Sequence, residues 1–343
     1  DHEDPGLIFC GTEFGVFFSP NNGKTWKQLS NGLPTIAVRD IAIQRDMNDL
    51  VLGTFGRGFY VLDDYSPLRT IENKKISQKA MIFSTREAIM WEKANPLGLP
   101  GKSFQGDNFY TGDNLDPVAM INYYYNENYK SIKDKRRDIE KGLIKSNKDV
   151  FYPNYEELKA EMDESEAKLL FTIKNSDNIV VKKVLKKPSK GLNRFHWNLR
   201  YETTNPINLS SPSFYNPFAG TREGTLVEPG IYTIQMDYLV DGNVTPLVEP
   251  NSFTVSLLEN TVLPAEDRKV KIKFQRDVAK MQGEISSYSS ILSEINNKMK
   301  YFEVAILKLE KPMDELSSEF NDIKEKFKKI STMFYGDNVK RRL

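Results

Sequence analysis

Few residues in this sequence combine the types and spacing that catalysis requires. The 343 residues include two histidines, His2 and His196, and one cysteine, Cys10. A Ser-His-Asp triad or a zinc site cannot be built convincingly from two histidines. His196 stands beside Trp197 in a strand-like run, which favours a packed or surface histidine. We therefore predict no catalytic residue, no metal and no cofactor in this chain.

Three aspartates, Asp107, Asp113 and Asp116, gather in a stretch rich in glycine and asparagine. Carboxylates are typical Ca²⁺ ligands, but this spacing lacks the pattern of an EF-hand loop. A solvated loop is the default interpretation, and a Ca²⁺ site is the alternative.

Composition excludes several classes of partner. The formal net charge is +1, so no global electrostatic attraction to nucleic acid, to an anionic membrane or to acidic substrates is expected. No run approaches the roughly 18–20 apolar residues that span a bilayer. The single cysteine, Cys10, excludes an internal disulfide, which leaves an extracytoplasmic location open.

A turn motif near the N-terminus is more informative about fold than about chemistry. The run from 19 to 26 fits the Asp-box pattern S-x-[D/N]-x-G-x-T-W, with Asn21 in place of the usual Asp. An Asx side chain bonds to turn backbone, glycine supplies positive φ, and the aromatic ring packs under the hairpin. We predict a structural role for the residues of this motif: Ser19, Asn21, Gly23, Thr25 and Trp26.

The elements around that motif repeat. Gly11-Thr12 and Gly53-Thr54 each precede a second glycine and aromatic residues, and the two pairs lie 42 residues apart. Four-stranded propeller blades have this period. Residues 1–70 are therefore predicted to form the final blades of an Asp-box β-propeller. A propeller needs at least four blades, so further blades are expected upstream of Asp1 or on another chain.

Residues 78–260 change pattern. Short β-type runs separated by turn signals, among them Asp241-Gly242, predict an immunoglobulin-like β-sandwich. A highly charged stretch at 126–166 is expected to be a helical or partly disordered insertion. The loop aromatics Phe214, Tyr215 and Phe218 are the best candidates for contacting a partner.

The last part, residues 264–335, is predicted to be helical. Apolar residues step by alternating four and three from Phe274 to Leu309, which is a heptad seam. The alternation continues beyond Pro312, which must break or kink the helix. An antiparallel hairpin is the simplest interpretation, with one kinked helix as the alternative. The seam packs either on its own hairpin partner, which is favoured, or on another protein.

A family resemblance now appears. The run from Val51 to Asp64 resembles the end of bacterial sortilin-like (VPS10-type) BNR-repeat propellers, with Phe55 where histidine is usual. The segment from Gly191 to Tyr201 and the strand from Pro229 to Thr233 also resemble this family. The resemblance implies a propeller, an immunoglobulin-like domain and a helical tail. It also implies protein or peptide binding at the propeller.

Many members of that family are labelled glycosyl hydrolases, so an enzymatic alternative stays open. Sialidases share the Asp box but need an arginine cluster, a Tyr/Glu pair and an acid. Arg57, which lies between two glycines, is a binding candidate that could line a propeller face. Pairing of Arg57 with Asp63 or Asp64 is the favoured alternative. Catalytic residues, if any, are expected in upstream blades.

The preferred hypothesis is a non-enzymatic binding or scaffold protein. It would be the C-terminal part of a larger propeller protein of the bacterial envelope or exterior, mainly β with an α-helical tail. Its expected partner is a protein or peptide, and a larger envelope assembly is the alternative; neither nucleic acid nor a membrane span is expected.

Overall fold

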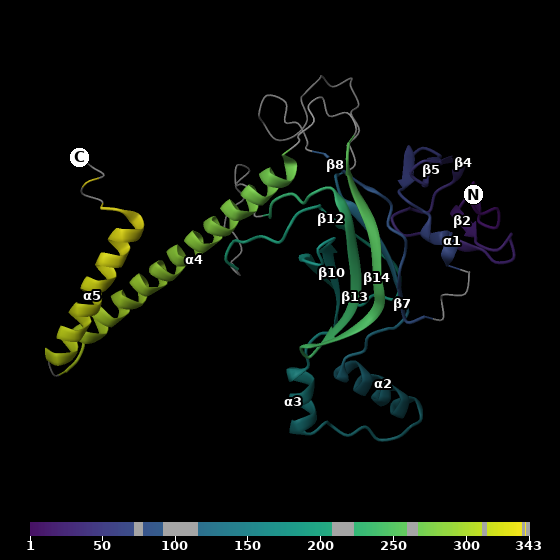
Figure 1. The fold of residues 1–343 in the computed structure, drawn as a ribbon. Helices are drawn as coiled ribbons and strands as arrows, with labels where there is room; N and C mark the ends of the chain where they lie inside the picture. The colour runs from purple at the N-terminus through teal and green to yellow at the C-terminus, as the bar shows by residue number, and fades with distance from the viewer. Residues whose placement is uncertain are drawn as a thin grey trace. The chain divides into compact units, whose positions relative to one another are not determined.

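Strands dominate the first part of the chain, and long helices follow. The computed structural model describes residues 1–71, 78–91, 116–207, 223–258, 267–310, 314–337 and 340 (Figure 1). These residues divide into two compact units, Asp1–Tyr201 with Leu226–Glu266 and Glu202–Thr225 with Asp267–Leu343. The predicted mainly β architecture with C-terminal helices is confirmed.

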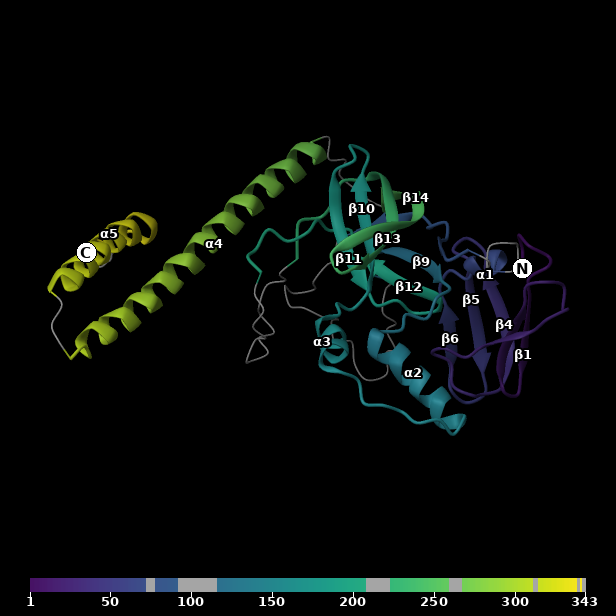
Figure 2. The same ribbon diagram turned by 90° about the horizontal axis from the view of Figure 1, so that it is seen from below.

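The chain begins with two three-stranded antiparallel sheets in which the spatial order of the strands follows the sequence. Their strands are β1 (Ile8–Thr12), β2 (Gly15–Ser19) and β3 (Lys27–Leu29), then β4 (Val38–Gln44), β5 (Asp49–Thr54) and β6 (Phe59–Leu62). Figure 2 shows β1, β4, β5 and β6 running alongside one another.

One apolar core lies between these two sheets. Its buried members are Leu7, Val16, Phe18, Val38, Leu50, Leu52, Tyr65 and Leu68, the last from helix α1 (Pro67–Thr70). The two sheets approach each other closely at Gly11, because a Cβ atom there would lie 2.8 Å from the Val38 carbonyl oxygen. The repeat glycine therefore lets the two sheets meet.

The next part of the first unit is built from two further sheets. A curled five-stranded sheet has the order β11-β10-β13-β14-β8, and a three-stranded sheet has the order β12-β9-β7. The strands are β7 (Ala80–Ile82), β8 (Ala88–Met90), β9 (Ala119–Tyr125), β10 (Lys168–Asn175), β11 (Val180–Lys186), β12 (Gly191–Trp197), β13 (Gly230–Val240) and β14 (Asn243–Leu257). Figure 1 shows β13 and β14 as long, curved strands.

The turn between β13 and β14 follows from its sequence. Asp241 and Gly242 have φ values of 48° and 75°, and Val240 pairs with Asn243 across the turn. Two consecutive residues with positive φ are the requirement of the type I′ turn that joins twisted antiparallel strands. The predicted hairpin at this position is confirmed.

Aromatic side chains pack between the facing surfaces of the five-stranded and the three-stranded sheet. Phe171 on β10 lies 4.8 Å, between ring centroids, from both Tyr123 on β9 and Phe195 on β12. Trp197 lies 5.4 Å from Tyr232 in an edge-on arrangement. These rings are buried, so they form the centre of this part of the molecule.

Two short helices, α2 (Ile132–Lys145) and α3 (Tyr155–Asp163), lie between β9 and β10 in the charged stretch 126–166. Each begins with a capping box, Ser131 with Asp134 and Asn154 with Glu157. Neither helix has a fully buried residue. The stretch is therefore helical, held by caps and ion pairs more than by apolar packing.

The second unit contains α4 (Arg268–Leu307) and α5 (Asp314–Tyr335). The Ser289 and Tyr335 hydroxyls are 2.9 Å apart, and Lys324 Nζ donates to Glu303 at 2.7 Å. Later residues of α5 thus lie beside earlier residues of α4, so the helices are antiparallel. This arrangement is the antiparallel hairpin of the sequence prediction and not one kinked helix. Pro312 itself lies outside the described residues. None of the described helices is long and apolar enough to cross a membrane.

Candidate binding surface

The two copies of the sequence repeat form turns with the same threonine-to-glycine hydrogen bond but different lengths, two residues between β1 and β2 and four between β5 and β6. The Thr12 hydroxyl donates to the Gly15 carbonyl at 2.9 Å, and the Thr54 hydroxyl donates to the Gly58 carbonyl at 2.7 Å. Both turns connect neighbouring antiparallel strands, β1 to β2 and β5 to β6. The 42-residue sequence repeat is therefore also a repeat of local structure.

Both turns carry exposed aromatic side chains. Phe14 and Phe55 are each 69% exposed, and Phe59, at the start of β6, is 82% exposed. Large apolar groups exposed close together are typical of interaction surfaces, whereas a single one would need no explanation.

Arg39, the second residue of β4, connects the two turns. Its guanidinium lies 3.1 Å from the Glu13 carboxylate and 5.4 Å from the centre of the Phe55 ring. Both charged groups are more than half exposed, so their attraction adds little stability and mainly sets orientation. We call the surface formed by these residues the turn surface: Glu13, Phe14, Arg39, Phe55, Arg57 and Phe59.

Arg57 belongs to this surface as an exposed side chain between Gly56 and Gly58, which have φ values of 78° and 70°. Within the described chain it makes no ion pair with Asp63 or Asp64, so the favoured pairing is wrong. The reason is that Asp64 is buried, where its carboxylate accepts a hydrogen bond from the Asn122 amide instead.

Asp64 takes part in a buried polar network that the sequence interpretation missed. The Asn122 amide donates to the Asp64 carboxylate at 2.9 Å. Arg194 donates to the Asn122 side chain at 2.7 Å and to the Asp64 carbonyl at 2.8 Å. Burial lowers the pKa of the Arg194 guanidinium, and the nearby Asp64 charge opposes that shift. These contacts join the N-terminal sheets to the sheet that contains β9 and β12.

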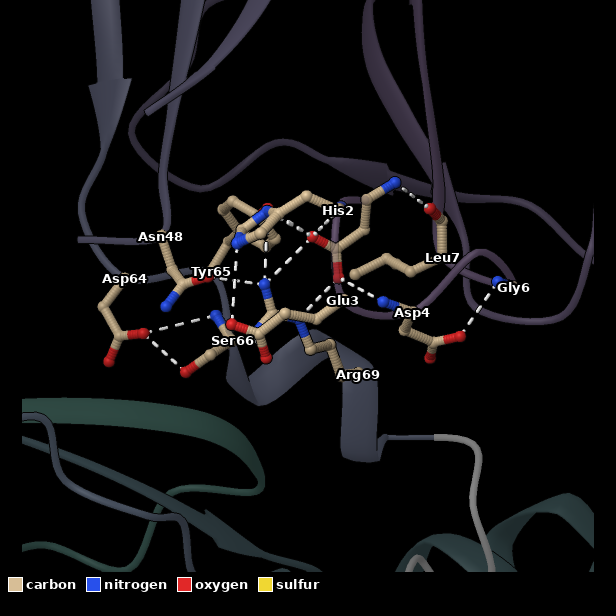
Figure 3. A network of polar contacts seen from close by, with 11 residues as sticks. His2, Glu3, Asp4, Gly6, Leu7, Asn48, Asp64, Tyr65, Ser66 and Arg69 are labelled. Carbon is tan, nitrogen blue, oxygen red and sulfur yellow. Dashed lines mark hydrogen bonds and ion pairs between the residues drawn. The ribbon is translucent and has the colours of Figure 1, made fainter. Parts of the chain in front are cut away.

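A second network holds the first residues of the chain on α1 (Figure 3). Arg69 donates to both carboxylate oxygens of Asp1, at 2.5 and 2.9 Å, and to Glu3 at 2.6 Å. The buried Tyr65 hydroxyl donates to Asp1 at 2.5 Å. Because these groups satisfy one another, we assign the network a structural role.

The predicted Asp-box residues form a hydrogen-bonded turn between β2 and β3. The side-chain oxygen of Asn21 accepts a hydrogen bond from the Thr25 N–H at 2.8 Å. The side-chain NH₂ of Asn21 donates to the Thr25 hydroxyl at 2.9 Å. The Gly23 N–H donates to the Ser19 hydroxyl at 2.8 Å, and Gly23 has φ 80°. This turn follows the end of β2, at the opposite end of that strand from Glu13 and Phe14 of the turn surface.

Trp26 rests against this turn without being enclosed by it. A Cβ atom at Gly23 would be 3.9 Å from the Trp26 ring, yet the side chain is 45% exposed. The Trp26 ring was expected to pack under the hairpin, and it contacts the turn but stays partly exposed.

The structure places some of the remaining sequence candidates and leaves others outside the described residues. His196 is exposed on β12, where partial burial lowers its pKa. The loop candidates Phe214, Tyr215 and Phe218 lie outside the described residues, as do Asp107 and Asp113. In the described ranges, no group of three or more His, Cys, Asp or Glu is placed to hold a metal ion.

The aromatic members of the turn surface were not singled out by sequence. Phe14 and Phe55 each lie within two residues of the threonine of one repeat copy. An aromatic residue within each repeat turn was the available signal.

Comparison with known proteins adds little to this geometry. No protein-family model and no curated protein matches the chain. One similar solved structure is the extracellular domain of a putative hybrid two component system from B. thetaiotaomicron, at 10% identity and a TM-score of 0.16. The match covers 73% of this chain and 30% of that one. At this TM-score the likeness carries no argument about fold or function.

Proposed function

We propose that this chain is a non-enzymatic module that binds a protein or peptide through the turn surface. The observation that carries the proposal is the repeated turn, which presents Phe14, Phe55 and Phe59 in exposed positions beside two arginines. Aromatic residues and arginine are enriched at protein interfaces relative to the rest of the surface. The expected ligand has apolar side chains and at least one carboxylate.

Electrostatics at the turn surface support a carboxylate in the ligand. Arg57 is exposed, and no ion pair of its side chain occurs within the described chain. Arg39 has one exposed partner, Glu13, which a ligand carboxylate can replace at low cost because exposed ion pairs are weak. A planar guanidinium binds a carboxylate through two parallel hydrogen bonds.

The wider architecture of this proposal rests on sequence. Residues 1–70 are proposed to be the final blades of an Asp-box propeller, residues 78–260 an immunoglobulin-like sandwich with an insertion at 126–166, and residues 264–335 a helical hairpin. The 42-residue repeat and the family resemblance support the propeller and an extracytoplasmic location. The turn surface then lies on one face of that propeller.

A peptide selection tests the proposal. A random peptide library is panned on the intact chain, and the enriched peptides are measured by fluorescence anisotropy. The triple variant Phe14→Ser/Phe55→Ser/Phe59→Ser should weaken binding at least tenfold, because it removes the apolar contacts. Arg57→Ala should weaken the binding of peptides that carry a carboxylate more than that of their amide analogues.

The matched control is Phe151→Ser, since Phe151 is 84% exposed and lies in the insertion away from the turns. It should leave binding unchanged. All substituted side chains are exposed, so the melting temperature should hold, and this is checked for each variant. Peptides that bind the triple variant as well as the parent protein would refute the proposal.

A further inference from the structure

The apolar seam of α4 has two halves that differ in what covers them. Residues 289–307 lie beside α5, as the contacts of Ser289 with Tyr335 and of Glu303 with Lys324 place them. Because α5 ends at Tyr335, it leaves residues 268–288 of the seam uncovered (Figure 2). These two halves of α4 have nearly equal lengths.

The uncovered half exposes an apolar stripe. Phe274, Met281, Ile285 and Tyr288 are 67%, 55%, 50% and 58% exposed. Their spacings of seven, four and three residues put them on one face of the helix. We call these four residues the free stripe.

Two contacts of this half of α4, both with Thr204, are made on the opposite face. The Thr204 hydroxyl donates to the Ala279 carbonyl at 2.7 Å, and a Cβ atom at Gly283 would lie 2.2 Å from the Thr204 carbonyl oxygen. Gly283 is two residues from both Met281 and Ile285, so at 100° per residue it faces away from the free stripe. The segment that crosses α4 at Thr204 therefore leaves the stripe accessible.

The covered half of the seam is itself incompletely filled. A groove of about 500 Å³ lies between α4 and α5 and is lined mainly by apolar side chains. Phe302 and Ile323 line it and are 62% and 54% exposed. Two helices alone cannot enclose such a seam, whereas a third or fourth helix can.

Charge separates the two ends of the hairpin. Residues 268–280 contain six Lys or Arg and one Asp, whereas residues 314–322 contain four Asp or Glu and no Lys or Arg. The two segments cannot neutralise each other in one copy. Position 303, beside α5, is about 44 Å along the helix from position 274 at 1.5 Å per residue, several screening lengths away.

We propose that a second copy of this chain covers the free stripe and fills the groove between α4 and α5. Two α4 helices associate antiparallel with their centre near Tyr288. The free stripe of each copy then enters the groove of the other, and the basic start of each α4 meets the acidic start of the other α5. A two-fold arrangement of this kind is closed, because each surface occurs once on each copy. An unrelated partner that covered the free stripe would leave the groove between α4 and α5 unfilled.

Sedimentation equilibrium of the intact chain tests the pairing. We expect a mass twice the 39.4 kDa of one chain at micromolar concentration. Met281→Glu/Ile285→Glu should weaken dimerisation at least a hundredfold. The control Tyr301→Glu changes a side chain that is 79% exposed on the side of α4 away from the seam, and it should keep the dimer.

Charge reversal tests the antiparallel orientation and does not depend on the apolar variant. Glu315→Lys/Glu319→Lys should weaken the dimer about tenfold, and adding Lys271→Glu/Lys273→Glu should restore it. Helicity by circular dichroism should be unchanged, because all four side chains are exposed. A monomer at every concentration, a dimer insensitive to Met281→Glu/Ile285→Glu, or a charge reversal without rescue would each overturn the proposal.

Discussion

The Asn122 side-chain amide donates a 2.9 Å hydrogen bond to the Asp64 carboxylate, and both residues are 2% exposed. Asp64 follows β6 in the N-terminal sheets, and Asn122 lies within β9. The bond therefore links two parts of the first unit that are 58 residues apart in sequence. Since Arg194 bonds to both residues, every charged or polar group in this contact has a partner.

Replacing Asn122 with leucine should destabilise the protein by about 2–4 kcal/mol, because the buried Asp64 and Arg194 each lose a partner. Urea denaturation followed by circular dichroism measures the loss. The control is Asn193→Leu, since the Asn193 amide donates only to the backbone carbonyls of Ser189 and Gly191 at the start of β12 among the described residues, and it should cost about 1 kcal/mol or less. Equal losses would argue against a special role for the buried contact.

The two repeat glycines should differ in their tolerance of alanine. A Cβ atom at Gly11 would approach the Val38 carbonyl oxygen to 2.8 Å, whereas one at Gly53 would meet Asp40 at 3.4 Å. Gly11→Ala should therefore cost about 1–3 kcal/mol through overpacking, and Gly53→Ala clearly less. Paired urea titrations test this, and an equal cost at both positions would contradict the close approach of the two sheets at Gly11.

Alkaline pH should destabilise the fold. Burial raises the pKa of Tyr123 and Tyr125 above 10, and burial together with a hydrogen bond to Glu164 raises the pKa of Tyr129 to about 12. The folded state holds these protons more tightly than the unfolded chain. Their contribution to stability is therefore complete below pH 10 and is lost as the pH rises towards the folded-state values.

Urea midpoints between pH 9 and 12, with tyrosine ionisation followed at 295 nm, measure that loss. Tyr129→Phe should make the decline shallower, since one raised pKa is removed. Tyr152→Phe is the control because Tyr152 is 86% exposed, and it should leave the slope unchanged. A stability that stays flat up to pH 12 would contradict the assignment of these tyrosines.

Local chemistry made much of the fold predictable. Asp241-Gly242 and Asn22-Gly23 predict turns because Asn, Asp and Gly tolerate positive φ at low cost, and these four residues have φ between 48° and 80°. The seam of α4 and α5 was predictable because apolar residues at steps of four and three define one helix face. In each case the residues that decide the structure are neighbours in sequence.

Contacts between distant segments were not predictable in the same way. Arg57 and Asp64 are close in sequence, which favoured an ion pair between them. The structure instead buries the Asp64 carboxylate, which accepts a hydrogen bond from Asn122, a residue 58 positions away in sequence. The turn surface was missed for a related reason, since Glu13 and Arg39 meet only when the two sheets pack together.

Hydrogen–deuterium exchange of the intact chain, with and without a peptide selected on it, tests the binding role of the turn surface most directly. The two turns contact the ligand in this account, so peptides covering residues 12–15 and 54–59 should exchange more slowly when it is bound. The Asp-box turn at 19–26 should be unaffected. Protection confined to other segments, with both turns unchanged, would contradict the central claim.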